Sequence, residues 1–269
     1  MSVPDPSSNA AVDKDEAIVL SVLIAAYNEE RTVGEVLSRV LATPLPTCEV
    51  VIVDDGSVDR TANIIETIAS QEPRIKFVRL SKNRGKTAAI ARAIAAARGE
   101  LLVIQDADFE YDPQEIPHLL APIHADKADV VYGSRFLNRD PTRSEYASNR
   151  VGNKFITWWS NLFTGYKLTD VETCLKVFRA GLIKPLILTS SGFGMEIELT
   201  AMIARTNARI VEVPISYEGR SFQEGKKISV WDGLAATWYV VYYGFVTRWS
   251  KRTRSYIRVA NEFLTSRGA

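Results

Sequence analysis

The sequence has few of the residue types that form disulfide bonds or bind transition metals. Its 269 residues include two cysteines, Cys48 and Cys174, and two histidines, His118 and His124. These are too few for a disulfide framework or for a zinc site built from several histidines and cysteines. Any bound metal ion is therefore expected to have carboxylate ligands.

The sequence also lacks features of exported and membrane-spanning proteins. The uncharged segment at residues 233–247 has fifteen residues, whereas a membrane-spanning helix needs about 20. The first residues are polar and acidic, where a secretory signal would need a basic start and an apolar run. We therefore expect residues 1–16 to be a disordered lead and the protein to be cytoplasmic.

A strong net charge is absent as well, because 33 Lys and Arg residues nearly balance 32 Asp and Glu residues. The balance is uneven along the chain. Residues 217–269 hold nine basic and four acidic side chains, a net +5, which leaves −4 for residues 1–216. This asymmetry indicates that the C-terminal part could meet an anionic partner.

Short β-branched runs alternate with helical patterns from residue 18 to residue 131, which predicts consecutive βαβ units and a parallel sheet. Strands are expected at residues 18–26, 49–54, 75–80, 100–105 and 129–133, and helices near 30–42, 59–71, 86–98 and 113–124. The later pattern predicts helices near 146–164, 180–188 and 194–206, and strands near 175–178 and at 209–217. The expected fold class is α/β, as one domain with a C-terminal elaboration.

Polar segments follow the five expected strands, where open α/β sheets bind their ligands. Asp106 and Asp108 follow a buried strand, and an extended backbone would project both carboxylates from one face. Such a pair favours a hard cation, Mg²⁺ or Mn²⁺. Asp54 and Asp55 end the second strand, where they can accept hydrogen bonds from ribose hydroxyls or base N–H groups, and Gly56 allows a sharp turn.

Five motifs follow one another along the chain: AAYNEE (25–30), IVDDGS (52–57), KNRGKTAAI (82–90), DADFEYDP (106–113) and GSR (133–135). This ordered set resembles glycosyltransferase family 2, whose members have the GT-A fold. The segments at 169–179, 192–199 and 213–227 are most similar to polyprenyl-phosphate sugar transferases of the dolichyl-phosphate mannose synthase kind. Cys174 is a departure, since many members have glycine there.

The resemblance implies a GT-A domain at residues 17–228 that binds a nucleotide-sugar donor, a GDP- or UDP-hexose. Asp106 and Asp108 match the position that holds the metal ion, Mg²⁺ or Mn²⁺, and the diphosphate. The residues assigned to the donor site are Ala26, Tyr27, Glu29, Asp54, Asp55, Gly56, Lys82, Gly85, Lys86, Gln105 and Ala107.

A polyprenyl phosphate acceptor is already ionised at neutral pH and needs cationic donors, whereas a sugar hydroxyl needs a general base. The candidate cations are Arg135, Arg150, Arg220 and Lys226, of which the resemblance favours Arg135 and Arg220. Asp170 matches the position of the catalytic base in members with hydroxyl acceptors. Here it is assigned to the active site either as that base or as a residue that orients an arginine.

The C-terminal residues 229–269 combine aromatic and basic side chains, which suits interfacial helices on anionic lipid. Packing on the domain core or on another protein is the alternative. The expected function is a metal-dependent, inverting hexosyltransferase on the cytoplasmic face of a membrane, acting on a polyprenyl phosphate, with a possible membrane-protein partner and no nucleic acid. Transfer to a sugar hydroxyl and a non-catalytic nucleotide-sugar-binding module remain alternatives.

Overall fold

The computed structural model describes residues 19–137, 147–219 and 230–268. Within these ranges, seven strands form one sheet in the order β3-β2-β1-β4-β6-β5-β7. The strands are β1 (Leu20–Ala26), β2 (Cys48–Asp54), β3 (Ile75–Arg79), β4 (Leu101–Asp106), β5 (Val130–Ser134), β6 (Lys176–Arg179) and β7 (Ile210–Pro214). All neighbouring pairs are parallel except those of β6, which runs antiparallel to β4 and β5. The predicted α/β fold with a mostly parallel sheet is confirmed.

The helices also follow the predicted order. They are α1 (Val33–Ala42), α2 (Thr61–Ala69), α3 (Lys86–Ala96), α4 (Ile116–His124), α5 (Ala147–Thr164), α6 (Ala180–Ile183), α7 (Met195–Ile203), α8 (Val230–Gly244) and α9 (Lys251–Gly268). Helix α6 ends at Ile183, five residues before the predicted boundary at residue 188, because Pro185 has no N–H with which to continue the helical hydrogen bonds.

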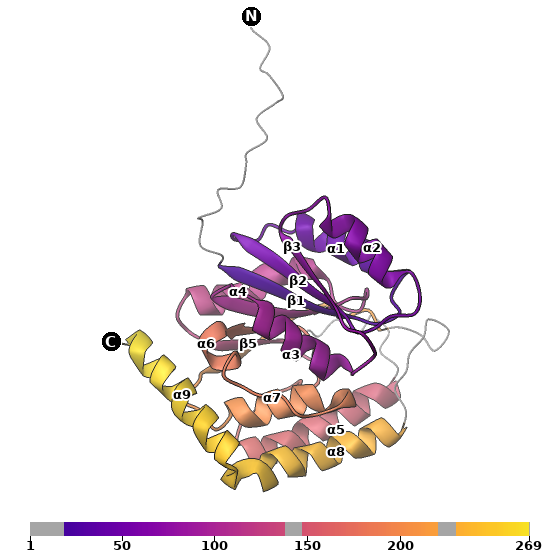
Figure 1. Ribbon diagram of the computed structural model, residues 1–269. Coiled ribbons are helices and arrows are strands. Elements are labelled where there is room, and N and C mark those ends of the chain that lie inside the picture. Colours follow the sequence, from indigo (N-terminus) through magenta and orange to yellow (C-terminus); the bar gives the residue numbers. More distant parts are fainter. Residues whose placement is uncertain (1–18, 138–146, 220–229, 269) are drawn as a thin grey trace, which may run out of the picture.

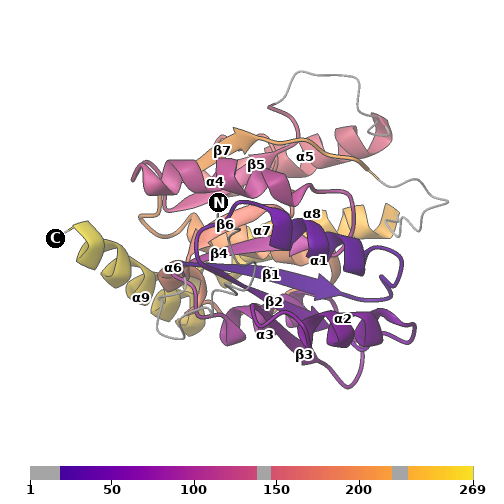
Figure 2. The same cartoon turned by 90° about the horizontal axis from the view of Figure 1, so that it is seen from above.

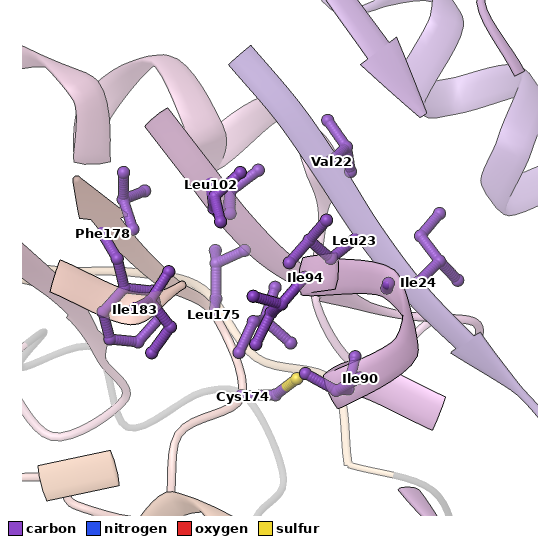
Figure 3. Close-up of a cluster of buried hydrophobic side chains, with 14 of the residues drawn as sticks. Val22, Leu23, Ile24, Ile90, Ile94, Leu102, Cys174, Leu175, Phe178 and Ile183 are labelled. Carbon is purple, nitrogen blue, oxygen red and sulfur yellow. The ribbon is translucent and has the colours of Figure 1, made fainter. Parts of the chain in front are cut away.

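The main core lies between the sheet and the helices that cover it. Central strands β1, β2 and β4 are buried on both faces, which explains why their sequences are continuous β-branched runs rather than alternating ones. In Figure 3, Ile90 and Ile94 of α3 lie among side chains of the sheet, including Leu23 of β1. The position of α3 is therefore fixed against the strands that carry the polar motifs.

The C-terminal part adds a helical layer beside the sheet. Figure 1 shows α5, α7 and α8 side by side below the sheet, and α9 running past α6 toward the C-terminus; Figure 2 shows the same layers from above. A second apolar cluster joins α5, α7 and α8 through Ile156, Ile197 and Val240. No helix in the described ranges is both long and apolar enough to span a membrane.

The turn after β2 brings two loops into close contact. Gly56 has φ +72°, a left-handed conformation that favours glycine. A Cβ atom at Gly56 would lie 2.5 Å from the carbonyl carbon of Lys82 and 2.7 Å from the backbone nitrogen of Asn83. The turn and the loop before α3 therefore fit together only when no side chain is present at residue 56.

We expect Gly56→Ala to lower the free energy of unfolding by at least about 2 kcal/mol, because it adds a backbone clash to an unfavourable φ. Gly34→Ala in α1 is the matched control, since its Cβ would lie 3.5 Å from the side chain of Ile64, an ordinary contact. It should leave stability unchanged or raise it by up to about 1 kcal/mol. Urea unfolding measures both, and equal effects would contradict the close-contact explanation.

Candidate active site

The strand ends with polar motifs meet at one edge of the sheet. Ala26 at the end of β1 pairs with Asp54 at the end of β2. On the other side of β1, Ala25 pairs with Asp106 at the end of β4. The predicted segments after these strands are therefore neighbours, as the parallel sheet requires.

Asp54 and Asp55 are buried and hold the loops of this edge. The carboxylate of Asp54 accepts a hydrogen bond from the backbone N–H of Ser57 at 3.3 Å and lies 3.4 Å from Nε of Arg79. The carboxylate of Asp55 accepts the backbone N–H groups of Arg84 and Gly85 at 2.8 and 2.7 Å. Asp55 thereby positions the loop that leads into α3. Contact of either carboxylate with a nucleoside stays a prediction.

The segment after β1 is tied to its neighbours through backbone groups. Asn28 adopts φ +55° and donates its N–H to Oγ of Ser57 at 3.0 Å. Thr32 donates through Oγ1 to the carboxylate of Glu29 at 2.9 Å and lies at the same distance from the carbonyl oxygen of Ala107. Tyr27 and Glu29 are half-buried. The structure thus brings the predicted donor-site residues of β1 and β4 together.

Lys86, the first residue of α3, extends its side chain into a cluster of acidic groups. Its Nζ lies 2.7 Å from Oδ1 of Asp106, 3.4 Å from Oε1 of Glu196 and 3.4 Å from Sγ of Cys174. Burial opposes the charged form, yet the negative charges of Asp106 and Glu196 outweigh it and hold the pKa of Lys86 well above its ordinary value. Lys86 is therefore a permanent cation beside the first aspartate of the DAD motif.

The two aspartates of that motif do not lie on one extended strand. Strand β4 ends at Asp106 and a bend begins at Ala107, so the expectation of a continued extended backbone is wrong. The bend is stabilised locally, since Asp108 accepts the backbone N–H of Glu110 at 3.0 Å. Gln105 is buried, and its side-chain amide donates to the carbonyl oxygen of Tyr111 at 3.0 Å, which stabilises the bend.

The donor set fits a hard cation that also binds phosphate. No group of three or more His, Cys, Asp or Glu side chains able to hold a metal occurs in the described ranges. Magnesium typically takes one or two carboxylates and completes its coordination with substrate phosphates and water. Asp106 and Asp108 could supply such carboxylates. The described residues do not form a metal site made only of protein ligands.

On the other side of the edge, Arg135 and Asp170 form a buried ion pair. Nε and Nη2 of Arg135 donate to the two carboxylate oxygens of Asp170, both at 2.7 Å, and the backbone N–H of Arg135 donates to Oδ2 at 3.0 Å. The side chains are 7% and 0% exposed. Both oxygens of Asp170 are thus engaged by one guanidinium in a two-pronged geometry.

Neighbouring side chains fix this pair in place. Glu212 of β7 accepts the backbone N–H groups of Thr169 and Asp170 at 2.8–3.0 Å. The ring of Tyr217 lies under the guanidinium of Arg135, with 5.0 Å from Cζ to the ring centroid. The hydroxyl of Tyr217 donates to Glu110 at 3.0 Å, which links the pair to the bend after β4.

Four other predicted residues stand apart from these contacts. Lys82 is exposed in the loop before α3. Arg150 is exposed at the start of α5, with its guanidinium 5.9 Å from the ring centroid of Phe136. Arg220 and Lys226 lie outside the described residues. The guanidinium of Arg135 lies 5.6 Å from the centroid of the same Phe136 ring, so Arg150 is exposed but near Arg135, and its assignment to the site stays a prediction.

Sequence reasoning missed several buried charges near the site. Glu172 interacts electrostatically with Glu196, Lys176 and Arg135, and its Oε1 is buried with no hydrogen-bond partner in the part of the chain that the structure describes. Lys176 in β6 is fully buried, and its Nζ donates to the backbone carbonyls of Val171 and Thr173. The available signal was a charged residue within an apolar run, as in CLKVF and GMEIEL.

The sequence of the chain is similar to those of known proteins. The sequence model for glycosyl transferase family 2 matches residues 21–184. An undecaprenyl-phosphate mannosyltransferase of Micrococcus luteus is 30% identical, with 80% of this chain and 94% of that protein covered. A dodecaprenyl-phosphate galacturonate synthase of Rhizobium johnstonii is 29% identical over 77% of this chain, which spans only 61% of that protein.

The fold also matches solved structures. Glucosyl-3-phosphoglycerate synthase from Mycobacterium tuberculosis, in complex with Mn²⁺, UDP-glucose and phosphoglyceric acid, superposes with a TM-score of 0.61 at 20% identity. The match covers 88% of this chain and 80% of that one. The chain therefore has the GT-A fold that its motifs predicted.

The raised pKa of the Glu172 carboxyl makes the stability of the fold depend on pH. Burial, followed by the charge of Glu196, raises the pKa of Glu172 from 4.5 to about 8. Between these pH values the unfolded chain has released this proton while the folded chain retains it. The contribution of Glu172 to stability is therefore complete below pH 4.5 and is lost as the pH rises toward 8.

We expect Glu172→Gln to lose less stability than the wild type between pH 5 and pH 8, because the glutamine cannot ionise. Glu66→Gln, at an exposed position of α2, is the control and should follow the wild-type curve. Urea unfolding at a series of pH values measures the difference. Parallel curves for wild type and Glu172→Gln would show that the carboxyl ionises normally in the folded protein.

Proposed function

The chain belongs to glycosyl transferase family 2, and from this premise we propose that it transfers a hexose from a nucleotide diphosphate sugar to a polyprenyl phosphate. In this reaction the bond between the anomeric carbon and the diphosphate breaks, and a bond from that carbon to an oxygen of the acceptor phosphate forms. Direct attack from the opposite face inverts the anomeric configuration. The nucleoside diphosphate leaves.

The engagement of Asp170 by Arg135 is the observation that carries this proposal. A hydroxyl acceptor needs a carboxylate that is free to take its proton, whereas both oxygens of Asp170 accept hydrogen bonds from Arg135. An ionised phosphate needs no proton removal. It needs cationic hydrogen-bond donors such as a guanidinium. Asp170 accepts hydrogen bonds from two of the five N–H donors of Arg135, one from Nε and one from Nη2.

The donor side needs charge neutralisation of the leaving diphosphate. Asp106 and Asp108 would hold Mg²⁺ or Mn²⁺, which would stabilise that charge when bound. Lys86 is already a cation 2.7 Å from Asp106 and can meet a diphosphate oxygen. Asp55 and Gly56 keep the loop before α3 in position, so that Lys86 projects from a fixed helix end.

The test of the function is a donor panel with a short polyprenyl phosphate, in which the products are identified by mass. We expect a lipid-linked monosaccharide from one of the UDP- or GDP-hexoses, and more of it with added Mg²⁺ or Mn²⁺. Donor hydrolysis without lipid product, or transfer only to a sugar hydroxyl, would contradict the proposal.

Arg135→Lys and Asp170→Asn should both raise the KM for the polyprenyl phosphate at least about tenfold, because each destroys the two-pronged pair that orients the guanidinium. The KM for the donor should change little. The double variant should be little worse than either single one, since Asp170 acts through Arg135 as a positioning residue. Loss of kcat in Asp170→Asn with an unchanged acceptor KM would instead identify Asp170 as a base.

An aromatic face on α5 and α8 supports a position on a membrane surface. Trp158 and Leu162 on α5 and Trp238 and Phe245 near α8 are 58, 64, 60 and 52% exposed. The opposite sides of both helices pack in the second apolar cluster. Exposed tryptophans beside basic residues suit insertion between lipid headgroups.

We expect Trp158→Ser and Trp238→Ser to weaken binding to phospholipid vesicles by about tenfold each, because each removes a large side chain from the aromatic face. Ile187→Ser is the control, since Ile187 is 63% exposed outside α5 and α8. Sedimentation with vesicles measures the binding. Wild-type binding by both tryptophan variants would exclude this face as the membrane contact.

A further inference from the structure

A pocket of about 340 Å³ lies where α5, α7, α8 and α9 meet. Phe163, Ala204 and Ile257 contribute apolar walls, and Arg205 and Arg248 bring two guanidinium groups to it. The pocket therefore combines apolar wall segments with two positively charged side chains.

The pocket is separate from the candidate active site. Glu196, which contacts Lys86, is in the first turn of α7, and Arg205 follows the other end of that helix. Nine residues separate the two, which is about 14 Å at the helical rise per residue. A ligand in this pocket would therefore not occupy the donor site.

Neither Arg205 nor Arg248 forms an ion pair with a carboxylate of the described residues. Arg205 donates through Nη1 to Oγ1 of Thr247 at 3.1 Å and through Nη2 to the carbonyl oxygens of Tyr243 and Gly244. These neutral oxygens, with the partial charges of a helix C-terminus, satisfy its donors without cancelling its charge. Burial and then the charge of Arg248 lower the pKa of Arg205 to about 10.

Arg248 differs from Arg205 because its side chain is exposed and makes no hydrogen bond or ion pair with another described residue. Its guanidinium is thus available for an external anion. An anion bound by Arg248 would also relieve its repulsion with Arg205.

The surroundings indicate that the anion belongs to an amphiphilic molecule. Leu162 precedes the pocket residue Phe163, and Trp249 follows Arg248; both side chains are at least 60% exposed. Phe245 and Val246, which follow Gly244, are about half exposed. Exposed apolar side chains therefore adjoin the pocket and continue the aromatic face of α8. A small soluble anion would make no use of them.

We propose that this pocket binds the phosphate of an acidic phospholipid, with Arg248 contacting the phosphate oxygens and Arg205 adding its charge. The inference rests on the proposed position at a membrane surface, which it deepens by naming the lipid class. The aromatic face would insert into any bilayer, whereas the arginine pocket would favour bilayers with negatively charged headgroups.

The test compares the full chain on phosphatidylcholine vesicles with and without phosphatidylglycerol. General attraction is worth about 1 kcal/mol per basic residue, or about fivefold in affinity. Arg254→Gln removes an exposed charge of α9 outside the pocket. Its affinity for phosphatidylglycerol vesicles should therefore fall by no more than about fivefold. The affinity of Arg248→Gln should fall at least about 30-fold for vesicles with phosphatidylglycerol and should change little for vesicles of phosphatidylcholine alone. Equal losses in the two variants would overturn the site.

A second variant tests the cavity without changing charge. Ala204→Leu would fill part of the pocket and should abolish the preference for phosphatidylglycerol while leaving binding to phosphatidylcholine intact. Thermal melts establish that the variants fold. A retained preference, or displacement from phosphatidylglycerol vesicles by millimolar inorganic phosphate, would overturn a phospholipid site.

Failure of this inference can be told apart from failure of the proposed function. Transfer to a short polyprenyl phosphate in detergent should proceed equally in wild type and Arg248→Gln, because Arg248 is outside the candidate active site. If the protein prefers phosphatidylglycerol vesicles but transfers no sugar, only the proposed transferase function is contradicted. Transfer without vesicle selectivity would count against the headgroup site alone.

Discussion

The buried ion pair between Arg135 and Asp170 is the interaction on which this edge of the sheet depends. It joins the end of β5 to the segment before β6, while Glu212 of β7 holds the backbone of the same segment. Removing one partner of such a pair leaves the other charge buried and costs about 3–5 kcal/mol. The pair is thus part of the fold, and both carboxylate oxygens of Asp170 accept hydrogen bonds within it. An acceptor that brings its own negative charge suits this arrangement.

The near-zero net charge of the chain results from two opposite charge distributions. In the first 216 residues, acidic groups either fold the loops at the sheet edge, as Asp55 does, or form the cluster around Lys86, as Asp106 does. In the last 53 residues, basic side chains outnumber acidic ones, and Arg248 from this part of the chain meets Arg205, from the first 216 residues, at a pocket. The proposed site for a cation and a nucleotide and the proposed surface for anionic lipid thus belong to parts of the chain with different charge.

The strands and most helices could be predicted from sequence, because buried parallel strands are continuous β-branched runs and amphipathic helices lie between them. The partners of the polar residues could not. The binding of a nucleoside by Asp54 and Asp55 stays a prediction, and the sequence did not show that their oxygens also hold backbone N–H groups of the turn after β2 and of the loop before α3. Arg135 and Asp170 are 35 residues apart, and only the antiparallel insertion of β6 beside β5 brings them together. Glu172 was missed because its burial comes from packing rather than from a local pattern.

The most direct test of the central claim is the pH dependence of kcat/KM for transfer to a polyprenyl phosphate and to its phosphonate analogue, whose second ionisation occurs at higher pH. If the acceptor's own charge makes it the nucleophile, the acidic limb of the profile reports the ionisation of the acceptor. The account predicts that this limb moves to higher pH with the phosphonate. A limb at the same pH for both acceptors would show that a base on the enzyme sets the rate, and would contradict the account.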